Sequence, residues 1–484
     1  MLKKFNLYQI QYSLYLLYLM CYNSINNLKF NLKGSVFLEL SKENKMGTMS
    51  EGKLLMNMSI PIMISMLIQA LYNIVDGLFV AKVSENAFNA VSIAFPIQML
   101  IISVGLGTGI GMNSLISRRL GEKRFDEANL AAENGIFLCI LSAIIFAIFG
   151  AFFSEKFINI FTDNIEIVRM GTNYLKICTV FSFGVFVQLA LERIMQATGN
   201  SFYNMVIQSV GAITNIILDP IFIFGLLKFP KLGITGAAIA TVIGQIIAMI
   251  LGLYIIIKKN DKIELRIKGF KPNINIIKEI YIVGIPSMIM QSITSVMTIG
   301  LNKILSNFSQ DAVSVFGAYF KFQSFIFMPV FGLTSGMIPI VGYNFGAKQK
   351  KRIVKTINLS IIASVSIMII GLIIFQIIPD QLLKIFNINL EIGIPALKII
   401  SISFIFAGVN IVFSCVFQAI GKAFYSLIIS LIRQLIVILP VAFIMAKLFG
   451  LTYLWTAFPI AEIIALIITL IIYTNIYKKY IKNL

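Results

Sequence analysis

Long apolar runs alternate with short polar connections along most of the chain. Between Leu54 and Tyr477 twelve runs each contain about 20 mostly apolar residues, the length at which a helix crosses the hydrocarbon core of a bilayer. The predicted spans lie near 58–81, 88–117, 131–153, 170–192, 202–226, 234–258, 280–304, 314–342, 354–378, 394–419, 424–447 and 452–477. This pattern predicts an all-α polytopic membrane protein with twelve transmembrane helices.

The first six spans and the last six spans resemble each other. Four landmarks recur in the same order: Ile60-Pro61 with Ile285-Pro286, GLGTG at Gly105 with GLTSG at Gly332, Leu120-Gly121 with Phe345-Gly346, and QATGNSFY at Gln196 with QAIGKAFY at Gln418. Such ordered matches indicate an internal duplication. Because each half has an even number of spans, we predict two six-helix lobes related by a pseudo-two-fold axis along the membrane normal. The first lobe is placed at 50–258, a polar linker at 259–278 and the second lobe at 279–484.

Residues 1–49 differ from the rest of the chain. Their one apolar run, Leu14–Tyr22, is too short to span a bilayer. We interpret 1–49 as an N-terminal extension, either from an upstream start with Met46 or Met49 as the true initiator, or as an interfacial helix. The first explanation predicts that a chain beginning at Met49 transports as well as the full chain.

The composition supports a membrane protein and argues against a nucleic-acid partner. The 484 residues are 58% hydrophobic and 13% charged, with a mean hydropathy of +0.90. The net charge of +19 comes from Lys and Arg residues in short loops, mainly on one side of the predicted spans. Positive-inside sorting explains this distribution. We therefore expect a monomer in a bacterial-type inner membrane, with the lipid bilayer around it and both termini in the cytoplasm.

Little in the sequence points to an enzyme. The four cysteines fall mostly inside apolar runs without metal-like spacing, and the chain has no histidine. No candidate nucleophile is paired with a base. We expect no enzymatic activity and no cofactor. A channel also explains the sequence less well than a transporter does, because a channel would not need duplicated lobes with mid-span acids in only one of them.

The stretch from Ser209 to Gly225 should cross the bilayer, yet it carries Asn215, Asp219 and Pro220 near its centre. A carboxylate at that depth costs about 2.5–3.5 kcal/mol on insertion scales. Asn215 and Asp219 are four residues apart, so their oxygens lie on one helix face and can meet one cation or proton. Pro220 should open the helix there by freeing the carbonyl of Ile216. The alternative is that Asp219 only caps or pairs inside the helix bundle.

Two further spans of the first half carry polar residues. In the first span Gln69, Asn73 and Asp76 fall at i, i+4 and i+7, which makes one polar stripe on an apolar helix. This stripe should face protein or water. In the sixth span Thr241 offers a hydroxyl group, which could equally bond to its own helix backbone.

The second half has a different set of mid-span charges. Arg433 lies in the eleventh predicted span and Glu462 in the twelfth. A cation and an anion on neighbouring helices should pair with each other, and we predict a structural ion pair.

These residues resemble a known family. PIMISMLIQALYNIVDGLFV at Pro61, GLGTGIGMNSLISRRLG at Gly105, QATGN at Gln196 and NIILDP at Asn215 are similar to the multidrug and toxic compound extrusion (MATE) transporters, in particular the DinF-like branch and its MepA-like bacterial members. The resemblance extends in order from about Ser50 to the C-terminus.

The resemblance implies two lobes around a V-shaped cleft and export of amphipathic, often cationic, small molecules in exchange for H⁺ or Na⁺. It puts the coupling role on Asp76, Asp219, Asn215, Gln69 and Thr241, and a possible Na⁺ site at the first three. NorM-like members have further acids in spans 7 and 10, where this chain has Thr294 and Asn410. Coupling through the second half is therefore not implied. The alternative function is a flippase or exporter of a lipid-linked saccharide from the same superfamily.

Overall fold

The computed structural model describes residues 44–266, 269–386 and 388–484. The run Leu14–Tyr22 lies outside the described residues. The helices of the first half are α2 (Lys45–Thr48), α3 (Glu51–Ala81), α4 (Glu85–Gly121), α5 (Phe125–Asn159), α6 (Ile165–Val180), α7 (Phe183–Ala197), α8 (Ser201–Phe224) and α9 (Ile234–Lys259).

The second half is likewise helical where it is described. Its helices are α10 (Ile274–Ser306), α11 (Gln310–Gly346), α12 (Lys350–Ile377), α13 (Pro379–Ile385), α14 (Leu390–Ser401), α15 (Ser403–Ala419), α16 (Ala423–Leu431), η1 (Ile432–Val437), α17 (Ile438–Phe449), α18 (Leu451–Leu454), α19 (Ala457–Ile476) and η2 (Tyr477–Ile481). Because α9 ends at Lys259 and α10 begins at Ile274, the predicted linker at 259–278 is too long at both ends.

The described helices account for the predicted spans. Ten helical segments are long and apolar enough to cross a membrane, and two bent pairs raise the number to as many as twelve. The pairs α6–α7 and α14–α15 are bent by 44° and 45°. Each pair stands fourth among the spans of its half. The two halves therefore share a bend as well as sequence landmarks, which supports the duplication.

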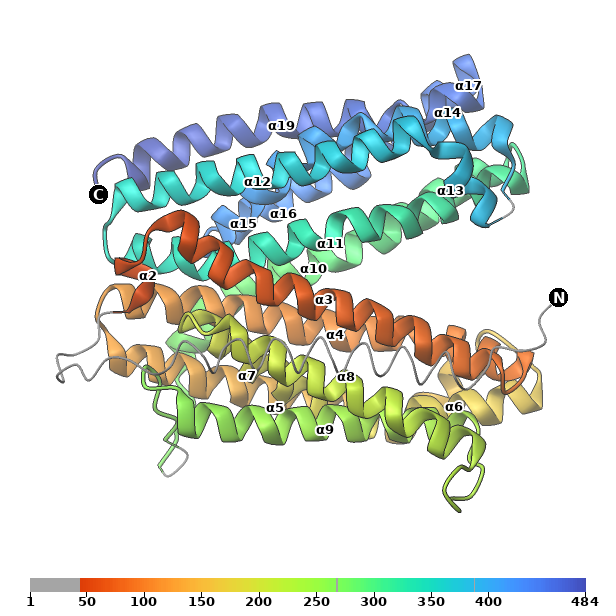
Figure 1. Cartoon of the computed structure of the whole chain (residues 1–484), viewed down its shortest axis with the longest axis horizontal. Coiled ribbons are helices and arrows are strands. Elements are labelled where there is room, and N and C mark those ends of the chain that lie inside the picture. The colour runs from red at the N-terminus through yellow and green to blue at the C-terminus, as the bar shows by residue number, and fades with distance from the viewer. Residues whose placement is uncertain (1–43, 267–268, 387) are drawn as a thin grey trace, which may run out of the picture. The chain divides into compact units, whose positions relative to one another are not determined.

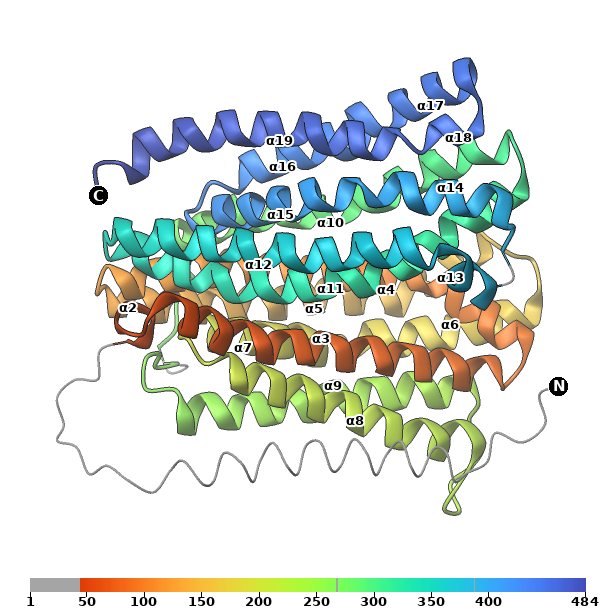
Figure 2. The same ribbon diagram turned by 45° about the horizontal axis from the view of Figure 1, so that its top comes forward.

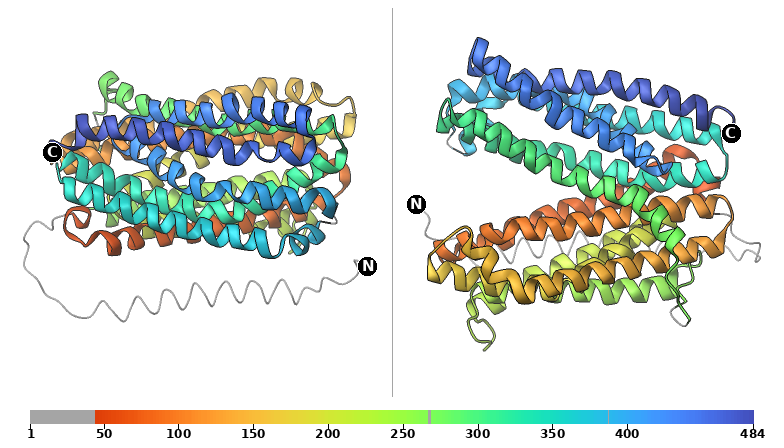
Figure 3. Two further views of the ribbon diagram at one scale, coloured as in Figure 1. Left: turned by 90° about the horizontal axis from the view of Figure 1, so that it is seen from above. Right: turned by 180° about the vertical axis from the view of Figure 1, so that it is seen from behind.

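Within Asn44–Leu484 the helices α3 to α9 form one lobe and α10 to α19 the other (Figures 1 and 2). The lobes pack together through α3 against α11 and α4 against α10. Glycines allow this close approach: a Cβ atom on Gly107 would lie 2.9 Å from the Gly284 carbonyl oxygen, and one on Gly336 would lie 2.9 Å from the Ser59 backbone nitrogen. These contacts involve one end of each helix, and the ribbons of the lobes diverge toward the other end (Figures 1 and 3).

Residues 44–49 belong to this packed end, in contrast to the expectation that 1–49 is an extension. Met46 of α2 is fully buried among residues of the second lobe. Its carbonyl oxygen accepts hydrogen bonds from Asn344 Nδ2 (3.1 Å) and Arg352 Nη2 (3.1 Å). Arg352 Nη2 also donates to the Met49 carbonyl oxygen at 2.6 Å. A boundary at residue 49 therefore cuts through a buried contact with α11 and α12.

We predict that a chain beginning at Met49 is less stable than one that lacks only residues 1–43. Removing Met46 takes one of two acceptors from Asn344 Nδ2 and one of two from Arg352 Nη2, at about 1–3 kcal/mol for each N–H left unsatisfied, and it also removes a fully buried side chain. Thermal unfolding in detergent and export from vesicles measure the effect, with the chain lacking 1–43 as the matched control. Equal melting temperatures and equal export for the two chains would restore the original expectation.

Candidate functional site

The acidic stretch of the first lobe lies on α8, which packs between α3 and α9 (Figure 1). Asp219 is fully buried and Asn215, one turn earlier, is 2% exposed. Pro220 lies inside α8, which continues to Phe224. The helix continues past the proline, and Pro220 supplies no N–H for the Ile216 carbonyl.

Asn215 connects Asp219 to Thr241 of α9. When its amide is oriented to satisfy both neighbours, the nitrogen donates to Asp219 Oδ2 (3.1 Å) and the oxygen accepts from Thr241 Oγ1 (3.1 Å). The two helices come this close because of glycines on α9. A Cβ atom on Gly236 would lie 2.5 Å from the Phe222 carbonyl oxygen, and one on Gly244 would lie 2.7 Å from the Gly211 carbonyl oxygen. The Thr241 hydroxyl thus faces α8 and does not only bond to its own helix.

Asp76 of α3 completes this cluster. Its carboxyl group lies in hydrogen-bonding contact with that of Asp219. Two ionised carboxylates are both acceptors and cannot bond to each other, so the contact requires a shared proton or a cation. Asp76 Oδ1 is buried and has no hydrogen-bond donor among the described residues. The cluster therefore has unused acceptor capacity in a buried place.

The three residues of the polar stripe on α3, Gln69, Asn73 and Asp76, lie in different environments. Gln69 Oε1 accepts a hydrogen bond from Gln208 Nε2 of α8 at 2.8 Å, two turns away from Asp76. Asn73 is exposed. Tyr72, which the sequence reasoning missed, interacts electrostatically with both Asp76 and Asp219. Its position one turn before Asp76 on the same helix face is a feature that could have identified it.

The donor set of this cluster suits a proton or a hard monovalent cation. Carboxylate, amide and hydroxyl oxygens are the ligands that hard cations prefer. Transition metals favour sites with histidine or thiolate ligands. Among the described residues, no group of three or more His, Cys, Asp or Glu side chains could hold a metal ion.

The acid of the second lobe is in a different environment. Arg433 Nη1 lies 3.1 Å from Glu462 Oε1, and Asn410 Nδ2 donates to Glu462 Oε2 at 2.8 Å. Thr294 Oγ1 donates to Gln434 Oε1 at 2.9 Å. Thr294 and Asn410 stand where NorM-like members have acids. Thr294 is thus hydrogen-bonded to a neutral side chain, and Asn410 donates a hydrogen bond to the Glu462 carboxylate. A compensated carboxylate of this kind is a poor cation site.

We predict that Arg433→Gln lowers the stability of the protein more than the double variant Arg433→Gln with Glu462→Gln does. The single change leaves a largely buried carboxylate without its cation, at about 3 kcal/mol. The double change removes both charges and keeps the bond from Asn410 to the Glu462 carbonyl oxygen (3.0 Å). Thermal unfolding of the three proteins in one detergent tests this. Equal melting temperatures for single and double variants would mean that the pair has no structural role.

Comparison with known proteins identifies the family. The model of the MatE family matches residues 61–221 and 286–444, one segment in each lobe. The chain is 28% identical over 379 residues to "Multidrug export protein MepA" of Staphylococcus haemolyticus, covering 76% of this chain and 82% of that protein. The protein of the same name from Staphylococcus aureus is 28% identical over 377 residues, with the same coverage of both chains.

Solved structures share the fold. A multidrug resistance MATE family transporter of the MOP superfamily in an outward-facing conformation superposes with a TM-score of 0.85 at 23% identity, over 92% of this chain and all of that one. A MATE structure in a bent conformation gives a TM-score of 0.86 at 24% identity, over 92% of this chain and 99% of that one. Since the family model matches both lobes and most of the chain, the protein belongs to the MATE family of membrane transporters.

Proposed function

We propose that this chain is a secondary active multidrug efflux antiporter that exports amphipathic, often cationic, compounds in exchange for H⁺ or Na⁺. The observation that carries the proposal is the contact between Asp76 and Asp219, with Asn215 and Thr241 beside it. Relatives named as multidrug export proteins support the substrate class.

Exchange follows from competition for the same carboxylates. An ammonium group about 4 Å from an ionised aspartate gains roughly 4 kcal/mol at an effective dielectric constant of 20. A proton or a sodium ion on the Asp76–Asp219 pair cancels that attraction, so coupling ion and cationic substrate exclude each other. The neutral oxygens of Asn215 and Thr241 could serve Na⁺ as ligands. The 21 Met and 40 Phe residues also offer adaptable apolar surface, although most of them must serve packing or face lipid.

The arrangement of the lobes suits loading from outside the cell. The lobes contact each other at the end that carries Arg118, Arg119 and Arg352, which positive-inside sorting places in the cytoplasm. Asp76 lies thirteen residues beyond Met63, which packs on α11 at Gly332 and is thus about 20 Å farther along the helix. The pair would then face the outer half of the membrane, where an inward-moving ion arrives.

We predict that Asp219→Asn abolishes counter-ion-driven export of a cationic dye from reconstituted vesicles. The amide keeps the shape of the side chain but has no charge with which to attract a cation. Melting temperature and insertion should stay close to those of the wild type. The double variant Arg433→Gln with Glu462→Gln in the second lobe, which leaves no unpaired charge, is the matched control and should retain export. Wild-type export by Asp219→Asn would contradict the site assignment.

The identity of the coupling ion can be tested by binding of a permanently charged cation, such as tetraphenylphosphonium. If one proton is shared by the pair, the cation should release a proton on binding at neutral pH, and its affinity should fall as the pH falls. Asp76→Asn should abolish the proton release. Competition by Na⁺ without proton release would assign coupling to sodium. Affinity that depends on neither pH nor Na⁺ would contradict exchange at this pair.

A further inference from the structure

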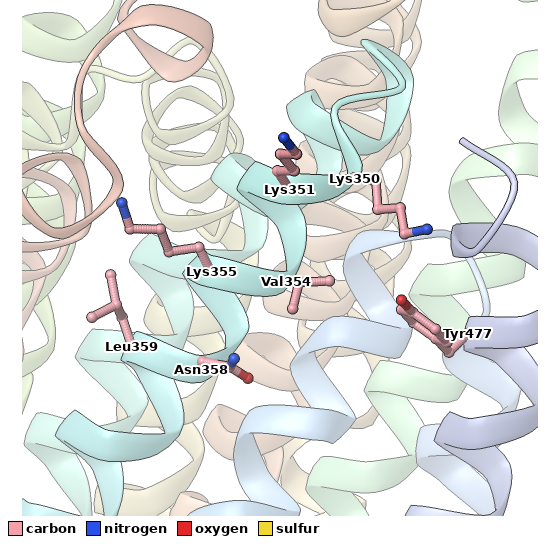
Figure 4. A pocket seen from close by; sticks show the side chains of 7 residues that line it. All are labelled: Lys350, Lys351, Val354, Lys355, Asn358, Leu359 and Tyr477. Atoms are coloured by element: carbon pink, nitrogen blue, oxygen red, sulfur yellow. The ribbon is translucent and has the colours of Figure 1, made fainter.

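A basic cavity lies at the N-terminal end of α12, far from the acidic pair (Figure 4). It has a volume of about 420 Å³. Lys350, Lys351 and Lys355 line it together with Tyr477 of η2, and Val354 and Leu359 form its apolar part. Figure 4 shows the Lys355 and Lys350 side chains on opposite sides of the cavity, with Tyr477 next to Lys350. The cavity therefore combines a positively charged wall with an apolar one.

The equivalent place in the first lobe also borders a cavity, of about 380 Å³, but its lining includes the carboxylates of Asp126 and Glu133. The repeat that aligns Gly121 with Gly346 aligns the start of α5 with the start of α12, so that Asp126, Asn129 and Glu133 correspond to Lys351, Val354 and Asn358. The segment between α9 and α10 lies over this face of α5. Its Glu264 backbone nitrogen donates to Asn129 Oδ1 (3.0 Å), and its Arg266 backbone nitrogen donates to Glu133 Oε1 (2.7 Å).

The second lobe has a different chemistry on this face. Asp126, Asn129 and Glu133 of the first lobe are replaced by Lys351, Val354 and Asn358, so both carboxylates are lost. The first-lobe cavity balances Arg266 and Lys271 with Asp126 and Glu133, whereas the described residues that line the second-lobe cavity include three lysines and no carboxylate. The duplication thus provides an internal comparison in which the second-lobe cavity is the one better suited to an anion from outside the protein.

The lysines are held in place but not neutralised. Lys350 Nζ donates to the Lys482 carbonyl oxygen at 2.7 Å and lies 5.9 Å from the centre of the Tyr477 ring. Lys355 Nζ lies 3.0 Å from Glu51 Oε2. Arg352 Nη1 also lies 3.6 Å from Glu51 Oε1, so this one carboxylate does not balance Arg352 and the three lysines. That balance suits a phosphate group.

Below the lysines α12 presents an apolar face to the surroundings. Ile362 is 63% exposed and Ile377 is 72% exposed, with Ile369 and Ile373 exposed between them. Of these, Ile362 and Ile369 lie about 10 Å and 21 Å from Lys355 along the helix, within reach of the acyl chains of one leaflet, which fills about half of a hydrocarbon core about 30 Å thick. A ligand with an anionic head and long apolar chains therefore matches both parts of this surface.

We propose that this cavity binds the phosphate headgroup of an anionic glycerophospholipid of the cytoplasmic leaflet, with the acyl chains along Ile362 and Ile369 of α12. Basic pockets between membrane helices on the cytoplasmic side are suited to such headgroups. The site lies next to the start of α3, the helix that carries Asp76, because Lys355 both lines the cavity and pairs with Glu51 of α3. This inference rests on the orientation in the proposed function, but not on its substrate or coupling ion.

The test is lipid binding by the purified full chain in a neutral detergent, measured by native mass spectrometry. Phosphatidylglycerol should be retained in preference to phosphatidylcholine with the same acyl chains. Lys351→Gln with Lys355→Gln should weaken phosphatidylglycerol binding about thirtyfold, the effect of two lysines near an anionic surface. The matched control removes two exposed lysines at the end of α9, Lys258→Gln with Lys259→Gln, and should retain the preference.

Four outcomes would overturn the proposal. They are equal retention of the two lipids by the wild type, full preference in the Lys351 and Lys355 double variant, an equal loss in the α9 control, and displacement of the lipid by inorganic phosphate alone. The last would assign the cavity to free anions. If the double variant does not fold, Lys351→Gln alone at its exposed position should still weaken binding severalfold, and unchanged binding would again overturn the proposal. None of these measurements depends on transport, so failure of the export assays would leave this result intact.

Discussion

The contact between two buried carboxyl groups constrains the first lobe. Asp76 and Asp219 come from different helices, and their oxygens cannot meet unless a proton or a cation lies between them. The close packing of α8 against α9 at Gly236 and Gly244 brings Asn215 and Thr241 to the same place. An ion at this pair therefore affects three helices at once. A change in its occupancy is a local electrostatic event that can alter how these helices pack.

The duplicated lobes use the same framework for different purposes. In the first lobe the mid-span acids contact each other and keep an unused acceptor at Asp76 Oδ1. In the second lobe Glu462 is compensated by Arg433 and Asn410. The starts of α5 and α12 differ in the same way, because the cavity at α5 is lined by Asp126 and Glu133 and the cavity at α12 by three lysines. Duplication preserved the helix positions, while substitution at a few polar positions made the polar chemistry of the two lobes different.

Contacts between the lobes are concentrated at one end. Glycines at 107 and 336 let backbones approach where any side chain would collide with the opposite lobe. At the same end the buried carbonyl of Met46 joins the start of the described chain to Asn344 and Arg352. These are short-range interactions that need close packing. A rearrangement that opened this end would have to break them together, which favours two discrete arrangements of the lobes over a continuous range.

The sequence alone determined the features that depend on local pattern. Hydrophobic runs set the number and approximate limits of the spans, repeated landmarks set the two lobes, and an i, i+4 spacing placed Asn215 beside Asp219 on one helix face. The tertiary structure decided which faces meet. The contact of Asp76 with Asp219, the electrostatic interaction of Tyr72 with both, the exposure of Asn73 and the burial of Met46 all depend on how helices distant in sequence pack. Helical periodicity defines a face but not its neighbour, because the neighbour is chosen by side-chain shape and close backbone approach across the whole bundle.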